Sequence, residues 1–130
     1  MGTKITPYNK DNASKKDQVA KMFDSIANRY DFLNHFLSLG VDIIWRKIAV
    51  REIAKANPKL ILDIATGTAD LAIIASKITN AEVVGIDISN KMLDLGKEKI
   101  RKENLGSRIK LLIQDAENLS FDNNSFDAVT

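Results

Sequence analysis

The sequence predicts an α/β fold built on a parallel sheet of the Rossmann-like, doubly wound kind. Three short apolar runs, at residues 60–64, 82–87 and 109–114, have the length and branching typical of buried parallel strands. Stretches with helical periodicity separate these runs. Because β-α-β connections are right-handed, we expect the strand order 3-2-1, with a fourth strand starting at Phe126 on the other side of the first.

The residues before the sheet are predicted to be helical. Residues 1–16 are polar and are expected to form a flexible tail, and residues 17–57 a helical cap of three amphipathic stretches. The apolar positions of the first two stretches are Val19, Met22, Phe23, Ile26, Tyr30, Phe32, Leu33, Phe36 and Leu37. The third is expected to begin with Asp42 as its N-cap. Its buried face is expected to comprise Ile44, Trp45, Ile48, Ala49, Ile53 and Ala56.

Residues 58–130 are expected to form the first part of the Rossmann-like domain. A helix over about 70–79 follows the first strand. Ser89 is a typical N-cap for the next helix, which is expected to run to about Asn104 with Gly106 at its exit. Residues 122–125 predict a turn before the fourth strand. Because that strand spans only Phe126 to Thr130, we expect an incomplete sheet with an open edge that favours self-association.

Composition limits the class of protein. A length of 130 residues fits one domain at most, and 45% hydrophobic with 28% charged residues favours a folded core. No apolar run approaches the roughly 20 residues of a membrane-spanning helix. The absence of cysteine excludes disulfides and thiolate chemistry, and a single histidine argues against a metal site. These features fit a cytoplasmic protein.

Charge is distributed unevenly along the chain. Residues 1–57 carry ten Lys and Arg against six Asp and Glu, whereas residues 58–130 carry nine against eleven. The basic half is either an ordinary solvated surface or a surface that helps the protein approach an anionic membrane. No dense basic patch with interleaved aromatic residues is present, which argues against nucleic-acid binding.

Each of the three predicted strands ends near an aspartate, namely Asp63, Asp87 and Asp115. The carboxyl ends of parallel strands share one edge of a sheet, where ligands bind in folds of this type. A carboxylate accepts hydrogen bonds through two oxygens and can hold both hydroxyls of a ribose. The small-residue turn at 65–69 would let a ligand approach the backbone closely. The sequence therefore predicts a site for a ligand with hydroxyl and amine donors.

A dinucleotide site is the main alternative for such a turn. Its fingerprint requires glycines where this chain has Ala65, Gly67 and Asp70, so only Gly67 fits. Asp70 would also place a negative charge at the helix N-terminus, where a pyrophosphate binds. A cationic ligand that carries an amine is better matched to these residues.

Motifs at these positions resemble those of a known family. The segments Asp63-Ile-Ala-Thr-Gly-Thr-Ala-Asp70, Gly85-Ile-Asp87 and Gln114-Asp115-Ala116 resemble the first three motifs of class I S-adenosylmethionine-dependent methyltransferases. Segments 22–34 and 37–46 resemble the narrower signature of quinone C-methyltransferases, which methylate demethylmenaquinol or a polyprenyl benzoquinol precursor of ubiquinone. The resemblance covers residues 19–130 and implies a seven-stranded sheet, of which this chain contains about the N-terminal half.

The resemblance implies that S-adenosyl-L-methionine is the cofactor and assigns its nucleoside to two strand ends. Asp87 is expected to hold the ribose hydroxyls. Asp115 and the backbone N–H of Ala116 are expected to contact the adenine edge. The structural alternatives are a solvent-exposed acid at a strand end for Asp87 and a loop acid for Asp115.

The turn is expected to hold the methionine portion of the cofactor. Gly67 lets the backbone approach it, and Thr68 matches a cofactor-contacting position of the family; for both, simple turn chemistry is the alternative. Asp63 is expected behind the turn, where it either makes structural hydrogen bonds or reaches the cofactor amine through water. Ala69 is a departure, because the family has glycine there. If this residue has positive φ, alanine costs about 1 kcal/mol.

The narrower signature is carried by Tyr30, Asn34 and Trp45. Tyr30 and Asn34 are expected either to cover the site near the substrate or to be structural, and Trp45 is expected in the core. Asp42 stands where the family commonly has histidine, and His35 does not align with that position. No catalytic residue is therefore identified.

The implied function is S-adenosylmethionine-dependent C-methylation of a polyprenyl quinol in menaquinone or ubiquinone biosynthesis. The hydrophobic substrate implies that the protein works as a peripheral protein at the inner face of the membrane. Two alternatives remain open: a methyltransferase for another small molecule, and an inactive chain that retains at most partial cofactor binding. This chain alone is expected not to turn over, because half the implied sheet and the acceptor pocket lie outside it.

Overall fold

A four-stranded parallel sheet lies at the centre of the structure, a computed structural model that describes residues 15–38 and 41–130. The strands are β1 (Leu60–Ile64), β2 (Glu82–Asp87), β3 (Ile109–Ile113) and β4 (Ala128–Val129). Their order is β3-β2-β1-β4, which confirms the predicted topology. Asp63 pairs in register with Gly85, and Asp87 with Ile113, so the strands end close to one another at one edge.

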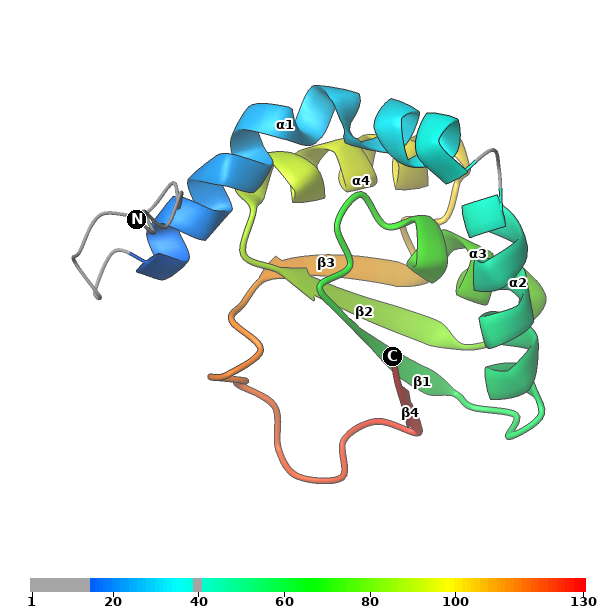
Figure 1. Ribbon diagram of the computed structural model, residues 1–130. Helices are drawn as coiled ribbons and strands as arrows, with labels where there is room; N and C mark the ends of the chain where they lie inside the picture. The colour runs from blue at the N-terminus through cyan, green and yellow to red at the C-terminus, as the bar shows by residue number, and fades with distance from the viewer. Residues whose placement is uncertain (1–14, 39–40) are drawn as a thin grey trace, which may run out of the picture.

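Four helices lie on one side of this sheet, and the long connection from β3 to β4 runs on the other (Figure 1). They are α1 (Lys15–Ser38), α2 (Val41–Ala54), α3 (Asp70–Ile78) and α4 (Asn90–Lys102). Helices α3 and α4 pack directly on the strands, α1 packs on α4, and α2 packs on α3. Since no described helix is both long and apolar enough to cross a bilayer, the structure shows no membrane span in this part of the chain.

The core lies between the sheet and helices α3 and α4. It is made of small and branched side chains, which allow the helices to approach the strands closely. Its most buried members include Ile61, Val83, Ala72, Leu93 and Ala81. Val50 of α2 is fully buried in the same cluster, so the helical cap is part of this core.

Helix α1 differs from the prediction at both ends. It begins at Lys15, two residues inside the expected tail, whereas residues 1–14 lie outside the described residues. It continues without a break to Ser38, so the two amphipathic stretches form one helix. Among residues 15–30 of this helix, whose burial is described, Ala27 is buried, and Ile26, one of the apolar positions of the predicted stripe, is exposed.

Helix α2 buries a different face from the one predicted, and of the residues expected on the buried face only Ile53 packs against the core. The helix begins at Val41, so Asp42 lies in its first turn and is not the N-cap. Val50 is buried and Ile53 packs against the core, but Trp45 has 62% of its surface exposed. The prediction of a core position for Trp45 was therefore wrong, as it was for Ile44 and Ile48, which are also exposed. Apolar residues lie on both sides of α2, so the 3.6-residue period did not identify the buried side.

The ends of α4 show one prediction confirmed and one corrected. Ser89 is the N-cap, and its hydroxyl oxygen accepts a hydrogen bond from the Met92 N–H at 3.2 Å. After the helix, Asn104 has the left-handed conformation (φ 58°), whereas Gly106 does not. Asparagine takes this conformation more readily than other side-chain-bearing residues because its short amide can bond locally. Strand β4 begins at Ala128, two residues later than expected.

Candidate cofactor site

The turn after β1 alternates between ordinary and left-handed backbone. Ala65, Gly67 and Ala69 have φ values of 56°, 59° and 73°. The Thr66 N–H donates to the Ile86 carbonyl at 2.8 Å and the Ala69 N–H to the Thr66 carbonyl at 3.0 Å, so the turn is fixed to β2 and closed on itself. The strain foreseen at Ala69 is therefore present in the structure, and Ala65 adds a second instance. Each left-handed alanine costs about 1–2 kcal/mol.

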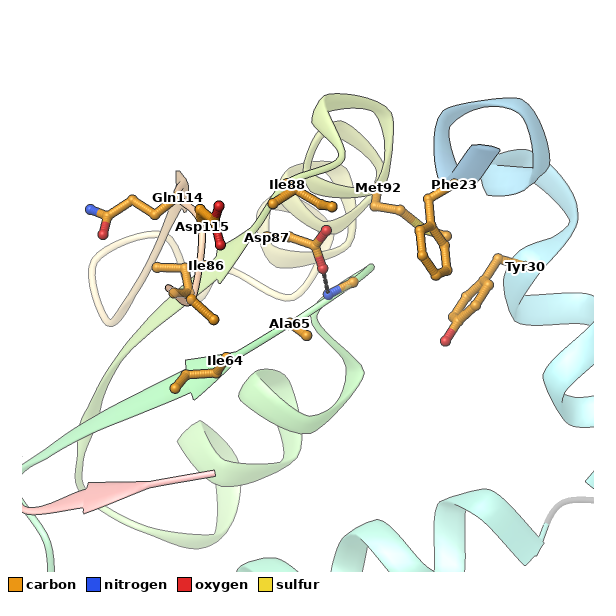
Figure 2. Close-up of a pocket in the computed structure, with 12 residues that line it drawn as sticks. Phe23, Tyr30, Ile64, Ala65, Ile86, Asp87, Ile88, Met92, Gln114 and Asp115 are labelled. Carbon is orange, nitrogen blue, oxygen red and sulfur yellow. Dashed lines mark hydrogen bonds between the residues drawn. The ribbon is translucent and has the colours of Figure 1, made fainter. Parts of the chain in front are cut away.

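Asp87, the last residue of β2, is held by backbone donors on both carboxylate oxygens. Oδ2 accepts from the Gly67 N–H at 2.8 Å, which Figure 2 draws as a dashed line, and Oδ1 accepts from the Ser89 N–H at 2.9 Å. A carboxylate has about four lone-pair positions, so each oxygen retains acceptor capacity. The two N–H groups thus orient the carboxylate for a ligand with a pair of hydroxyls, such as a ribose.

Asp115 lies two residues beyond the end of β3. Its Oδ1 accepts from the Glu117 N–H at 2.9 Å, and its Oδ2 lies 2.5 Å from the Lys16 Nζ of α1. The bond from Lys16, followed by that from the Glu117 backbone, holds the pKa of Asp115 below its usual range. Asp115 is therefore a charged acceptor at neutral pH. The carboxylates of Asp115 and Glu117 in turn raise the pKa of Lys16.

A cavity of about 310 Å³ brings these residues together. Asp87, Asp115, Ala116 and Gly67, all predicted from the sequence, line it. The remaining lining is mainly apolar and comprises Phe23, Tyr30, Ile64, Ala65, Ile86, Ile88, Met92 and Gln114. A few acceptors in an apolar cavity are typical of a site for a small organic ligand. Ile88 and Met92, which follow Asp87 along the chain, also line the cavity and were not predicted from the sequence.

Helix α1 covers one side of this cavity. Phe23 and Tyr30 extend from it toward the strand ends (Figure 2), and their rings meet edge to face at a centroid distance of 6.4 Å. Tyr30 therefore lines this cavity. Asn34 belongs to α1, but its side chain lies outside the described residues.

Three polar contacts that the sequence did not reveal connect α1 to the residues around the cavity. Lys16 contacts Asp115, and the Asp24 Oδ1 accepts from the Ser89 hydroxyl at 2.5 Å and from the Lys91 N–H at 3.1 Å. Asp24 thus lies at the N-terminus of α4, where a negative charge is favourable. These pairs join residues far apart in sequence, which is why no local pattern pointed to them.

Asp63, in β1 just before the turn, and Thr68, within the turn, line a second cavity. Asp63 is buried, and it accepts from the hydroxyls of Thr66 at 2.7 Å and Thr130 at 2.9 Å. Burial raises the pKa of Asp63 despite these bonds. The Thr68 Oγ1 accepts from the Lys99 Nζ at 2.9 Å. Both residues have partners within the protein, so the structural role foreseen for Asp63 is the one its contacts support.

The fold and the site together define a class. A parallel sheet in the order 3-2-1-4, with aspartates near the ends of three adjacent strands and a tight turn after the first, is the class I methyltransferase arrangement. Within the described residues, no group of three His, Cys, Asp or Glu side chains is placed to hold a metal ion.

Comparison with known proteins agrees with this class and narrows it. The model of the ubiE/COQ5 methyltransferase family matches residues 11–130, and the chain belongs to that family. A demethylmenaquinone methyltransferase of Bacteroides fragilis is 45% identical over 128 residues, covering 98% of this chain and 52% of the relative. A ubiquinone/menaquinone biosynthesis C-methyltransferase of Geotalea uraniireducens is 44% identical over 118 residues, covering 89% of this chain and 50% of the relative.

A solved structure supports the same fold. A proposed S-adenosyl-L-methionine-dependent methyltransferase from Methanococcus maripaludis superposes with a TM-score of 0.64 at 22% identity. The match covers 94% of this chain and 51% of that chain. The chain therefore spans about half the length of the relatives and of the solved structure that it matches.

Proposed function

We propose that the protein is an S-adenosyl-L-methionine-dependent C-methyltransferase of menaquinone or ubiquinone biosynthesis that methylates a ring carbon of a polyprenyl quinol. The observation that carries the proposal is the Asp87 carboxylate, which is oriented by two N–H groups and lines a largely apolar cavity. The membership of the ubiE/COQ5 methyltransferase family supports the choice of chemistry.

The residues of the cavity fit the parts of this cofactor. Asp87 offers acceptors to the ribose hydroxyls, and Asp115 offers a charged acceptor to the adenine amine. Ile86, Ile88 and Met92 line the same cavity and offer apolar contact for the adenine ring. The left-handed Gly67, with no Cβ, leaves the backbone open to close approach.

Bound S-adenosyl-L-methionine, held by Asp87 and Asp115, would supply an electrophilic methyl group to the quinol ring carbon; S-adenosylhomocysteine would be the leaving group, and the ring proton would pass to solvent. A quinol is electron-rich, so the protein's main contributions are alignment and exclusion of water. Phe23 and Tyr30 contribute to the exclusion of water, since they cover the cavity from α1. Tyr30 lines both cavities and lies where an aromatic face would attract a sulfonium.

Titration calorimetry with S-adenosylhomocysteine tests the cofactor. The substitution Asp87→Asn leaves one acceptor oxygen where two are needed, so we expect at least a 10-fold loss of affinity. Asp122→Asn, in the exposed β3–β4 connection, is the matched control and should bind as the unchanged protein does. Absence of binding by the unchanged protein, or equal binding by Asp87→Asn, would contradict the proposal.

The acceptor is tested by transfer of a labelled methyl group to a demethylmenaquinol and, separately, to a polyprenyl benzoquinol. Because this chain spans about half the length of its relatives and is expected not to turn over alone, the assay uses the whole protein. Product from either quinol assigns the substrate, and product from neither with the whole protein argues for a different small molecule. The proposal also includes a cytoplasmic protein that contacts the membrane peripherally, because a polyprenyl substrate resides in the bilayer. Sedimentation with anionic vesicles, compared with neutral ones, tests this contact.

The edge strand β4 is only two residues long, and its outer side has no partner strand in the described sheet. Pairing of this edge with another copy is part of the proposal, and size-exclusion chromatography over a range of concentrations tests it. A single monomer peak at all concentrations would exclude it.

A further inference from the structure

The second cavity lies next to the cofactor site and differs from it in chemistry. It has a volume of about 250 Å³. It shares four lining residues with the first cavity, namely Tyr30, Ile64, Ala65 and Gly67. The rest of its lining is mostly polar or charged and comprises Arg46, Asp63, Thr66, Thr68, Asp70, Leu71 and Thr130. A ligand long enough to pass the turn at Gly67 would extend from the first cavity into the second.

Arg46 is the cation that lines this cavity. It lies on the side of α2 that carries Val50 and Ile53, and only 23% of its side chain is exposed. Its Nη1 lies 2.8 Å from the Asp42 Oδ2 and 3.6 Å from the Asp70 Oδ2. Only the contact with Asp42 is at hydrogen-bond distance, and both contacts use the same nitrogen. A guanidinium has five N–H donors in a planar fork, the geometry that binds a carboxylate through two bonds.

The negative charge of Asp70 is neutralised mainly by Lys99 rather than by Arg46. The Lys99 Nζ lies 2.8 Å from its Oδ1, closer than Arg46 lies to its Oδ2. The carboxylate of Asp70 therefore does not depend on Arg46 for a charged partner. Asp42, the i−4 neighbour of Arg46 on α2, fixes the orientation of the guanidinium from behind.

We propose that Arg46 binds the α-carboxylate of the amino-acid portion of the cofactor. This inference rests on the proposed function, which places the ribose at Asp87 and the adenine at Asp115 in the first cavity. The two cavities meet at Gly67, so the carbon chain beyond the sulfur enters the second cavity and directs its carboxylate toward α2. Arg46 then selects ligands that carry this carboxylate over nucleosides that lack it. Helix α2 thereby contributes directly to cofactor specificity.

Two ligands distinguish carboxylate binding by Arg46 from a purely structural ion pair of Arg46 between α2 and α3. S-adenosylhomocysteine carries the α-carboxylate, and 5′-methylthioadenosine lacks the amino-acid portion but keeps the ribose and adenine. In titration calorimetry, Arg46→Met is expected to weaken S-adenosylhomocysteine binding by about 10- to 100-fold. Binding of 5′-methylthioadenosine is expected to stay within about 2-fold.

Two further variants serve as controls. Arg46→Lys keeps the charge without the fork and is expected to lose less affinity than Arg46→Met. Lys55→Met removes an exposed cation immediately after the same helix, which pairs with Glu52 at 3.0 Å, and is expected to change the binding of neither ligand. An equal loss for both ligands in Arg46→Met, or no loss for either, would overturn the assignment. If the unchanged protein binds neither ligand, the proposed function itself fails. This result is distinguishable from the two outcomes that overturn only the assignment of Arg46, because in those the unchanged protein still binds.

Discussion

A methyl group added at Gly85 tests how tightly the turn is packed against β2. An ideal Cβ at this position would lie 2.7 Å from the Thr66 Oγ1, 2.9 Å from the Thr66 Cβ and 2.8 Å from the Leu111 Cδ2. All three distances are shorter than real Cβ contacts, so the buried Thr66 and Leu111 side chains have to move. Thr66 also donates to Asp63, and its displacement breaks a buried hydrogen bond.

The expected loss follows from two opposing terms. Overpacking of a buried position costs about 1–3 kcal/mol. Replacing glycine by alanine recovers about 0.4–1 kcal/mol, because the unfolded chain loses freedom. Because three contacts are too short at once, the upper half of the overpacking range, about 2–3 kcal/mol, applies. We therefore expect Gly85→Ala to lower the free energy of unfolding by about 1–2.6 kcal/mol. With a urea dependence of about 2 kcal/mol per M, the midpoint of unfolding falls by about 0.5–1.3 M.

Gly106→Ala is the matched control, since a Cβ there meets nothing within 4 Å and the backbone is not left-handed. It is expected to leave the urea midpoint unchanged or to raise it slightly. Urea unfolding followed by circular dichroism compares the two variants. A Gly85→Ala protein as stable as Gly106→Ala would refute the packing described for the turn.

Three other substitutions test separate features. Burial raises the pKa of Asp63 above 3.8, so the folded state binds this proton more tightly than the unfolded state does. The resulting contribution to the free energy of unfolding is fully present below the unfolded-state pKa and is lost as pH rises through the folded-state pKa. Asp63→Asn lacks this titration. When urea unfolding is measured from about pH 4 to 7, the free energy of unfolding of Asp63→Asn should improve relative to that of the unchanged protein as pH rises. A difference that stays constant with pH would argue against a raised pKa at Asp63. Ser89→Ala removes the N-cap of α4 and the donor to Asp24, and thermal or urea unfolding should show a loss of about 1–2 kcal/mol. Trp45→Ala should cost no more than about 0.5 kcal/mol in this chain because the ring is largely exposed, and a loss of several kcal/mol would show that it is buried.

The sheet and the rim of the site were predictable because their signals are local. Each strand is a short apolar run, and right-handed connections fix the order once the runs are found. Asp87 and Asp115 were expected at one edge because they end or closely follow adjacent strands, and both line the same cavity. The turn was recognisable from its small residues, and its left-handed Gly67 agrees with that interpretation.

What the sequence did not reveal depends on contacts between distant segments. Helix α2 has apolar residues all round, so only packing against α3 decides that Val50 is buried and Trp45 exposed. Arg46 was not singled out, because its place beside the turn follows from that same choice of face. The link between Asp24 and Ser89 spans 65 positions, which no periodicity reports.

The attachment of α1 has a consequence for the order of events during biosynthesis. Lys16 is among the first residues of the helix to leave the ribosome, but its partners Asp115 and Glu117 are made about 100 residues later. At about 5–20 residues per second, the helix waits roughly 5–20 s for them. Its apolar residues Phe23 and Tyr30 have no strand ends to cover during that interval. The nascent protein therefore leaves the apolar side of α1 that lines the first cavity uncovered until translation has passed β3.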